Sequence, residues 1–534
     1  MKMTNISAYP GDTNVNSHLQ AKRSFTYLWL IFVLIAAIAG IADITHFQKL
    51  PERFIGHGDQ ANTAIVARNM AEGRGAVTDS VWLMTNGGIS GNAIPQPESY
   101  WSIYVAFIIS IFFRLFGDNF AALLLPAVLA KTAIAGLATA ITLRLTKNTI
   151  AGLATASFLL MHPAMTAYVN GLSDIYLTLC VLVTCILLVS ATRSPSRYKY
   201  LVIGIVIGIA IGIKPSGGLL VGLLLCCFML SGNFQGLLAR AGLAGIGILL
   251  GLAPVMYHNQ QAFGSIISPA YALVGEAGRI TYVTGDHNRG LFDPEPLQAS
   301  TENPSDIKSR LGQNISYAIL FIRTFHAGDI VPAWQLPFIF LAILLMLRQI
   351  RTLSFFRDTS YENQFFSLAM LMLAAGVALG IVIHTESRYW NFLVPLLMVV
   401  TACTMVRISK YLPLFVVITS IFSFMLVQRY YVPIKIPDGM ALAKSKIPAN
   451  AVVLTPDPWE FSFHTRLKAV VLPYTKKPEI LRDISERYHA EYIVLIDGNI
   501  RNAFYSPLLE GHLPNYLSAV YRDQHLVIAK FNWQ

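Results

Sequence analysis

The sequence predicts an all-α polytopic membrane protein with outward juxtamembrane helices and a small α/β domain near its C-terminal end. Hydrophobic residues make up 54% and charged residues 13% of the 534 residues, whereas about a quarter of the residues in soluble globular proteins are charged. Apolar runs of roughly 17 to 25 residues recur along the chain, and each is long enough to cross a hydrocarbon layer about 30 Å thick. Such runs indicate membrane-spanning helices.

The apolar runs predict about eleven transmembrane helices. They lie near residues 27–45, 120–143, 150–168, 174–191, 200–213, 217–232, 241–258, 330–347, 362–383, 390–406 and 412–428. Residues 100–116, "YWSIYVAFIISIFFRLF", are also apolar, but we expect them to lie along the membrane interface with Tyr100, Trp101 and Tyr104 at the headgroups.

The distribution of basic residues supports this placement. If residues 100–116 do not cross the membrane, the basic loops all fall on one side, whereas counting that segment as a span scatters them across both sides. The basic residues of these loops are Lys22, Arg23, Arg144, Lys147, Arg193, Arg197, Lys199, Arg240, Arg348, Arg351, Arg357, Arg407 and Lys410. Basic loops are typically cytoplasmic. We therefore expect a cytoplasmic N-terminus, with outward loops at 46–119, 169–173, 259–329 and 384–389 and an outward tail after residue 429.

Three regions follow from this organisation. We expect a cytoplasmic N-terminus at 1–26, a transmembrane catalytic domain at 27–430 and an extracytoplasmic α/β domain at 431–534. The first region runs directly into an apolar span without a small-residue cleavage site, which is typical of an uncleaved anchor. In the last region, four segments have strand character and a fifth has helical periodicity. These segments are "NAVVLTPD", "KAVVLP", "EYIVLIDG" and "HLVIAKF" for the strands and "KPEILRDISERYHA" for the helix.

Charge and cysteine content exclude several classes of function. The formal net charge is +11, but the basic residues sit at the ends of spans, so the charge reports topology rather than nucleic-acid binding. All five cysteines lie in apolar spans, which indicates neither disulfides nor a thiolate metal site. The chain also has no glycine-rich phosphate loop of the kind that binds nucleotides.

The first outward loop contains an aspartate at the start of a predicted helix. In "RFIGHGDQANTAIVARNMAEG", two glycines precede Asp59, and residues 60–72 favour a helix. Asp59 is either an N-cap or a functional carboxylate. The helix has a modest apolar stripe and a polar face that includes Asn62 and Arg68, a pattern that suits the membrane surface.

Other charged residues are predicted at the same face of the membrane. Asp174 in "GLSDIYLTL" and Lys214 in "GIKPSGG" lie at outward turns, as do His384, Glu386 and Arg388 in "HTESRYWNFLVPLL". Taken singly, Asp174 can be a helix cap and Arg388 an interface anchor. Taken together, carboxylates can deprotonate an attacking group or hold a cation, and cations can stabilise a phosphate. The set predicts displacement of a phosphate-linked group beside the bilayer.

The order of these motifs resembles the GT-C superfamily of glycosyltransferases, which use polyprenyl-phosphate sugars and include protein O-mannosyltransferases and the aminoarabinose transferase of lipid A. The segments that carry the resemblance are "GHGDQANTAIVARNMAEGRG", "PESYW", "GLSDIYLTL", "GIAIGIKPSGGLLV", "FGSIISP" and "ESRYWNFLVPLL". The resemblance extends over most of the chain, since these segments are distributed between residues 56 and 397. The resemblance implies an inverting enzyme of the bacterial inner membrane that transfers a sugar on the outer face to a glycolipid, polysaccharide or protein acceptor, with the C-terminal domain in the periplasm.

The resemblance also implies roles for individual residues. Asp59 would be the catalytic carboxylate that activates the acceptor, and Asp174 would support the acceptor or a cation. Arg388, Lys214 and Tyr389 would bind the donor phosphate. A divalent metal cation is a possible cofactor, with His57 and His384 as auxiliary ligands. Two positions depart from the family pattern. Gln60 follows Asp59 where many relatives have a second acidic residue, which weakens a metal role. Gln96-Pro97-Glu98 stands where the lipid A enzyme has a phosphate-binding lysine, so donor binding is expected to differ in detail.

Two alternatives stay open on the sequence. A secondary transporter is also hydrophobic, but its charges usually lie near the bilayer midplane and its sequence usually falls into paired halves. A polysaccharide polymerase or ligase would depend on basic residues of the later loop, namely Arg279, His287, Arg289 or Arg323.

Overall fold

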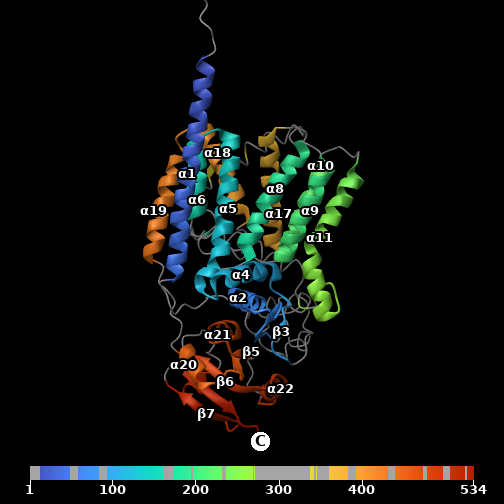
Figure 1. Cartoon of the computed structure of the whole chain (residues 1–534), viewed down its shortest axis with the longest axis vertical. Coiled ribbons are helices and arrows are strands. Elements are labelled where there is room, and N and C mark those ends of the chain that lie inside the picture. Colours follow the sequence, from blue (N-terminus) through green and yellow to red (C-terminus); the bar gives the residue numbers. More distant parts are fainter. Residues whose placement is uncertain are drawn as a thin grey trace, which may run out of the picture.

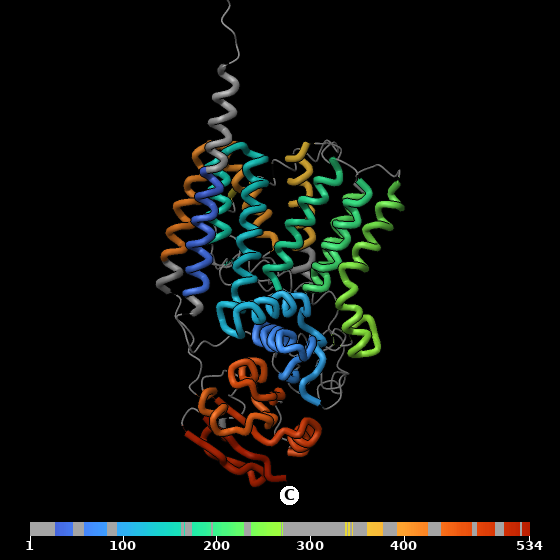
Figure 2. The backbone as a smooth tube through the Cα atoms, in the orientation of Figure 1, coloured from blue at the N-terminus to red at the C-terminus, as the bar shows by residue number. Residues whose placement is uncertain are grey.

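The protein is a bundle of upright helices with a mixed α/β domain beyond one end of the bundle (Figure 1). The computed structural model describes residues 12–48, 58–82, 93–161, 165, 173–193, 196–230, 236–268, 270, 337–338, 340–341, 344, 360–382, 392–430, 439–472, 478–496, 506–523 and 526–533. Figure 2 shows three layers in this part of the chain: the upright helices, a pair of helices that lie across their lower ends, and the C-terminal domain.

The upright helices account for most of the predicted spans. They are α1 (Asp12–Gln48), α5 (Phe120–Thr146), α6 (Thr149–Met161), α8 (Ser173–Arg193), α9 (Arg197–Ile213), α10 (Leu219–Leu230), α11 (Leu237–Phe263), α17 (Tyr361–Val382), α18 (Val394–Ile408) and α19 (Leu414–Tyr430). Within the described residues, α1, α5, α8 and α11 contain apolar stretches long enough to cross a membrane on their own. The protein is therefore a multi-span membrane protein. The total of eleven spans stays a prediction, and most of the predicted span at 330–347 lies outside the described residues.

Helices α9 and α11 pack closely, because glycines bring their backbones into contact. A Cβ atom at Gly204 would lie 2.1 Å from the carbonyl oxygen of Ala244, and one at Gly251 would lie 2.3 Å from that of Ile205. Small residues are the usual means of close helix packing in membranes. Large apolar side chains such as Leu30 and Ile418 are exposed on the outer surface of the bundle, as expected for a surface that faces lipid.

Three arginines lie in the last turns of upright helices, namely Arg144 in α5, Arg193 in α8 and Arg407 in α18. The guanidinium carbon of Arg144 lies 4.0 Å from the ring centroid of Tyr361, and that of Arg193 lies 5.9 Å from it. Arg407 pairs with Glu362 at the same end. These contacts agree with the expectation that the basic loops share one side of the membrane.

The opposite end carries the two crossing helices, α2 (Gly58–Ala71) and α4 (Ile103–Phe116). Helix α4 begins after Ser102, whose hydroxyl oxygen accepts a hydrogen bond from the backbone N–H of Val105 at 3.4 Å. It ends at Gly117, which has a φ of 82°. Because α4 lies across the ends of the upright helices (Figure 1), it has the orientation expected of an interfacial helix.

The C-terminal domain is built on a six-stranded mixed sheet with strand order β2-β5-β4-β6-β8-β7. The predicted strands and helix are present as β4 (Val452–Thr455), β5 (Lys468–Val471), β6 (Ala490–Ile496), β8 (Leu526–Phe531) and α22 (Pro478–Tyr488). Strand β7 (Leu517–Arg522) and helices α20 (Gly439–Lys446), α21 (Pro458–Thr465) and α23 (Ser506–Leu509) were not anticipated. Central residues such as Leu454 and Val470 are fully buried, so the sheet is the core of this domain.

The first outward loop contributes an edge strand to this sheet. Strand β2 (Ser80–Val81) pairs in parallel with β5, with Ser80 opposite Ala469. A second short pair, β1 (Val77–Thr78) with β3 (Gln96–Pro97), lies in the same loop. The membrane part and the C-terminal domain are therefore joined by backbone hydrogen bonds as well as by side chains.

Helix α2 differs from the expected surface helix. Its polar face is buried rather than solvated, with Asn62 fully buried and Arg68 6% exposed. The reason is that both side chains have partners in neighbouring segments: Asn62 donates to Glu98 at 2.6 Å, and Arg68 donates to Asp118 at 2.5 Å. Helix α2 therefore lies between α4 and α21. It has the sequence pattern of an amphipathic surface helix, but its polar face is buried.

Candidate active site

Asp59 lies in the first turn of α2, where the helix macrodipole favours a negative charge. Its Oδ1 accepts a hydrogen bond from the indole Nε1–H of Trp101 at 3.0 Å. The backbone carbonyl of Asp59 accepts a hydrogen bond from the Thr63 hydroxyl at 2.7 Å. The carboxylate is thus oriented by a neutral donor from a segment some forty residues further along the chain.

Trp101 is itself held firmly. Its backbone N–H donates to Oε1 of Glu98 at 2.8 Å, and the N–H of Tyr100 donates to the same oxygen at 2.7 Å. Its ring centroid lies 5.7 Å from that of Trp82 and 6.0 Å from that of Trp459. The donor to Asp59 is therefore fixed at both its backbone and its ring.

Glu98 is the buried anchor of this loop, with an exposure of 3%. Burial raises the pKa of Glu98 because it penalises the charged carboxylate, while the N–H groups of Tyr100, Trp101 and Asn62 oppose the shift. Its backbone carbonyl lies 2.8 Å from Nε2 of His258 at the end of α11. Glu98 therefore ties the loop to α2 and to the upright helices at once.

Asp174 and Lys214 contact each other directly. Asp174 lies in the first turn of α8, and Lys214 links α9 to the short 3-10 helix Pro215–Gly218. The Lys214 Nζ lies 2.5 Å from Oδ1 of Asp174, and the side chains are 17% and 5% exposed. The ammonium group therefore compensates the charge of the Asp174 carboxylate.

A short segment connects the two carboxylate regions. Trp101 contacts Asp59, and the next residue, Ser102, donates to the carbonyl oxygen of Gly212 at 3.2 Å. Gly212 lies two residues before Lys214 and packs against the ring of Tyr104, since a Cβ atom there would lie 2.4 Å from the ring. Asp59, Asp174 and Lys214 thus lie at the end of the bundle that carries α2 and α4.

Other predicted site residues lie outside the described residues. They are Arg388, Tyr389, His57 and His384, and the same holds for Arg279, His287, Arg289 and Arg323 of the alternative assignment. In the part of the chain that the structure describes, no group of three or more His, Cys, Asp or Glu residues is placed to hold a metal ion. The metal role of the two histidines stays a prediction, and no step of the proposed reaction requires a metal ion.

An ion pair that was not predicted from the sequence lies inside the bundle. Lys131 of α5 lies 2.8 Å from Asp43 of α1, and both side chains are almost completely buried, at 1% and 0% exposure. The available signal was a charged residue within each of two apolar runs, because ionisable residues in transmembrane helices usually have a partner. The pair ties α1, which leads into the first outward loop, to α5.

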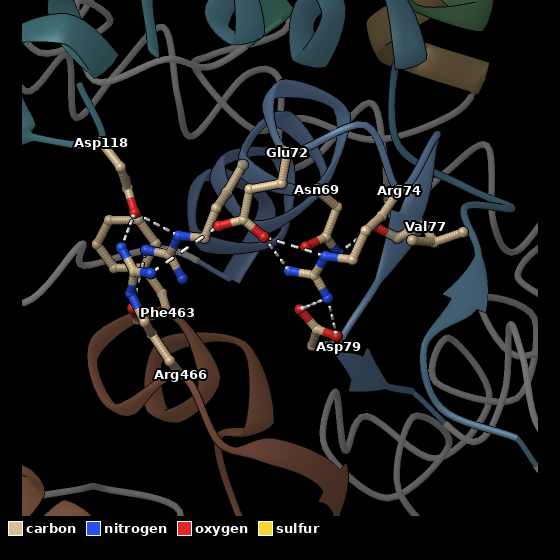
Figure 3. Close-up of polar contacts among 9 residues, drawn as sticks. Asn69, Glu72, Arg74, Val77, Asp79, Asp118, Phe463 and Arg466 are labelled. Carbon is tan, nitrogen blue, oxygen red and sulfur yellow. Dashed lines mark hydrogen bonds and ion pairs between the residues drawn. The ribbon is translucent and has the colours of Figure 1, made fainter. Parts of the chain in front are cut away.

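The C-terminal domain docks onto α2 and the loop before α5 through a charged junction. Asp118 accepts hydrogen bonds from Arg68 Nε at 2.5 Å and from Arg466 Nη2 at 2.7 Å. Arg68 also donates to the carbonyl oxygen of Phe463 at 3.1 Å. Figure 3 shows Asp118 and Arg466 turned toward each other, with Phe463 beside them. Asp118 therefore bridges an arginine of the first loop and one of the C-terminal domain.

Two further groups lie near this junction. Arg74 pairs with Glu72 at 2.8 Å and with Asp79 at 3.2 Å, at the edge of the first loop (Figure 3). His464, at the end of α21, has its pKa lowered to about 4 because burial disfavours the charged imidazolium and Arg68 adds a like charge. His464 is therefore neutral near neutral pH.

The comparisons with known proteins agree with this architecture. Residues 101–258 match the family described as dolichyl-phosphate-mannose-protein mannosyltransferase. This segment includes the helices α4 to α11 and therefore both Asp174 and Lys214. No curated protein sequence matches the chain.

Solved structures match over most of the chain. The crystal structure of the Archaeoglobus fulgidus oligosaccharyltransferase with Zn and sulfate has a TM-score of 0.56 at 11% identity and covers 86% of this chain and 68% of that one. The oligosaccharyltransferase AglB from the same organism, with an inhibitory peptide and a dolichol-phosphate, has a TM-score of 0.54 at 10% identity, over 88% and 70%. ArnT from Cupriavidus metallidurans, bound to undecaprenyl phosphate, has a TM-score of 0.44 at 15% identity, over 95% and 98%. At these identities the two oligosaccharyltransferase matches establish a shared fold.

Proposed function

We propose that this chain is a membrane glycosyltransferase that transfers one sugar from a polyprenyl-phosphate donor to an acceptor on the outer face of the bacterial inner membrane. The class is supported by the match of residues 101–258 to the family described as dolichyl-phosphate-mannose-protein mannosyltransferase. The observation that carries the proposal is the hydrogen bond from Trp101 to Asp59 at 3.0 Å, which orients a carboxylate at the same end of the bundle as the Asp174–Lys214 pair. In the wider family, AglB binds a dolichol-phosphate.

In the proposed reaction, Asp59 takes the proton of the acceptor hydroxyl as its oxygen attacks the anomeric carbon of the donor. The bond from that carbon to the phosphate oxygen breaks, and its electron pair stays on the polyprenyl phosphate. Direct attack inverts the anomeric centre. General-base assistance of this kind contributes on the order of 10² to 10⁴ in rate.

Lys214 is suited to binding the donor phosphate, because an ammonium group pairs strongly with phosphate oxygens. Asp174 holds the Lys214 ammonium at 2.5 Å, so we assign Asp174 mainly to orienting this lysine rather than to contacting the acceptor. Arg388 and Tyr389 are proposed to complete the phosphate site. A divalent cation bound through His57 or His384 is part of the proposal only as an optional aid to donor binding.

The side of the membrane is proposed from charge. Arg144, Arg193 and Arg407 lie at the end opposite Asp59, and basic loops favour the cytoplasm. We infer a cytoplasmic segment at 1–26, a transmembrane catalytic domain at 27–430 and a periplasmic domain at 431–534 that shares its side with Asp59.

The test is transfer of labelled sugar by the purified protein in liposomes. A panel of polyprenyl-phosphate sugars is supplied as donors, with envelope glycolipids, polysaccharides and peptides as acceptors. We expect one donor to give a product with inverted anomeric configuration, and we expect Asp59→Asn to abolish its formation. The matched control is Asp79→Asn, which changes an aspartate of the same loop that pairs with Arg74. A product of many repeat units would instead support a polymerase, and full activity of Asp59→Asn would remove that carboxylate from the mechanism.

A further inference from the structure

We propose that the C-terminal domain positions the reacting carboxylate, and that Trp459 is the positioning residue through which it acts on Trp101 and thereby on Asp59. The inference rests on the proposed function, because it assumes that Asp59 is the general base. It goes beyond that function by giving a specific role to a side chain of the C-terminal domain.

Trp459 lies against both parts of the Asp59 site. It sits in the first turn of α21 and is 5% exposed. Its ring centroid lies 6.0 Å from that of Trp101 at an interplanar angle of 74°, an edge-to-face contact. A Cβ atom at Gly58, the residue before Asp59, would lie 2.9 Å from Cε3 of the Trp459 ring. The same indole therefore contacts the donor to Asp59 and the backbone that carries Asp59.

The contacts around Trp101 explain why the Trp459 ring matters. Glu98 fixes the backbone of Trp101, but a backbone contact does not set the direction of the indole N–H. The rings of Tyr100, Trp82 and Trp459 pack around the Trp101 ring and set this direction, and those of Trp82 and Trp459 also contact each other with their centroids 5.9 Å apart. Removing one wall of this aromatic cluster, which we define as Trp82, Trp101 and Trp459, would let the Trp101 ring move and the Asp59 carboxylate turn.

The docking of the domain does not depend on Trp459 alone. Strand β2 pairs with β5, and Asp118 binds Arg68 and Arg466. These contacts keep α21 on α2 when the Trp459 ring is trimmed. A conservative change at Trp459 therefore tests the orientation of Asp59 rather than the attachment of the domain.

The proposed role of Trp459 predicts an effect on kcat. Misplacement of a reacting group by about 1 Å costs on the order of 10²-fold in rate. Since Trp459 contacts Trp101 and Gly58 and the donor phosphate is assigned to Lys214, loss of the Trp459 ring should lower kcat without changing the KM for the donor. If Trp459 acts through Trp101, its effect should vanish once the indole N–H of Trp101 is gone.

The experiment is a double-mutant cycle on the full-length protein in liposomes. We expect Trp101→Phe to lower kcat by roughly tenfold or more and Trp459→Phe to lower it by a smaller factor, both with the donor KM unchanged. The double variant should be no slower than Trp101→Phe alone, because coupled residues are not additive. Trp533→Phe, a change of a tryptophan elsewhere in the same domain, should match the wild type.

A second variant disturbs the position of Trp459 without removing its ring. Gly58→Ala adds a Cβ atom that displaces Trp459, so it should lower kcat in the wild type and have no further effect in the Trp101→Phe background. Effects that multiply in either cycle, or a wild-type kcat for Trp459→Phe, would overturn the inference.

The outcomes separate the two proposals. If Asp59→Asn is inactive while Trp459→Phe behaves as the wild type, only the positioning role fails. If Asp59→Asn transfers sugar at the wild-type rate, the proposed general base fails, and with it the premise of the inference.

Discussion

One described contact of each carboxylate at the α2 end of the bundle distinguishes the two. Asp59 accepts a hydrogen bond from the neutral indole of Trp101, whereas Asp174 pairs with the ammonium group of Lys214. A neutral donor orients a carboxylate without cancelling its charge, whereas an ammonium at 2.5 Å cancels it. The two contacts agree with the proposed roles, in which Asp59 takes a proton and Asp174 holds the ammonium group of Lys214.

The largest expected effect is therefore at Asp59. Asp59→Asn keeps the shape of the side chain and its contact with Trp101 but removes the basic oxygen, so we expect kcat to fall by about 10³-fold. The measurement is the initial rate of sugar transfer at saturating donor. An equal loss in the Asp79→Asn control would show that the loop, and not the base, had been disturbed.

The Asp174–Lys214 pair should respond in donor binding instead. Lys214→Met removes the cation assigned to the phosphate, so we expect the donor KM to rise by about tenfold, with Lys214→Arg closer to the wild type. Asp174→Asn keeps the lysine but loosens it, so its effect should be smaller than that of Lys214→Met. Donor titrations measure both. If Asp174→Asn lost as much kcat as Asp59→Asn, the contrast between the two carboxylates would be wrong.

A third carboxylate, Asp43, extends the comparison because its ion pair with Lys131 lies inside the bundle rather than at its end. Breaking a buried ion pair by removing one partner typically costs about 3 to 5 kcal/mol, so Asp43→Asn and Lys131→Met should each lower the thermal stability of the detergent-solubilised protein. The double variant should recover part of the loss, because neither charge is then left buried alone. A double variant less stable than both single variants would argue that the pair has a further role.

The smallest expected effect is on the pH dependence of stability, through His464 at the junction between the C-terminal domain and α2. The folded protein lowers the pKa of His464 to about 4, whereas the unfolded chain binds a proton near pH 6.5. The unfolded state therefore takes up the proton first, and stability is lost as the pH falls from about 6.5 toward 4. Thermal unfolding of the wild type and of His464→Gln over this range would measure the loss. The variant should lack this part of the pH dependence, and identical pH profiles would contradict the assignment.

The sequence by itself determined the class of protein and much of its layout. Long apolar runs require helices in a membrane because backbone polar groups have no water to bind there. The basic loops predicted a single side of the membrane, and this sidedness stays a prediction. The alternation of the C-terminal segments was enough to find β4, β5, β6 and β8. Asp59, Asp174 and Lys214 were selected as candidate site residues because charges beside apolar runs are costly and therefore conspicuous.

Only the tertiary structure decided the partners of these residues. Trp459 reaches Asp59 through Trp101, Lys214 reaches Asp174, and the two-residue strand β2 joins a sheet that lies hundreds of residues later in the chain. A strand of two residues has no periodicity to detect, and the polar stripe of α2 looks the same whether water or a buried partner satisfies it. The physical reason is that the pattern of apolar and polar residues depends on the surroundings of each segment by itself. Hydrogen bonds and ion pairs instead depend on the distance between segments, and only folding brings these segments together.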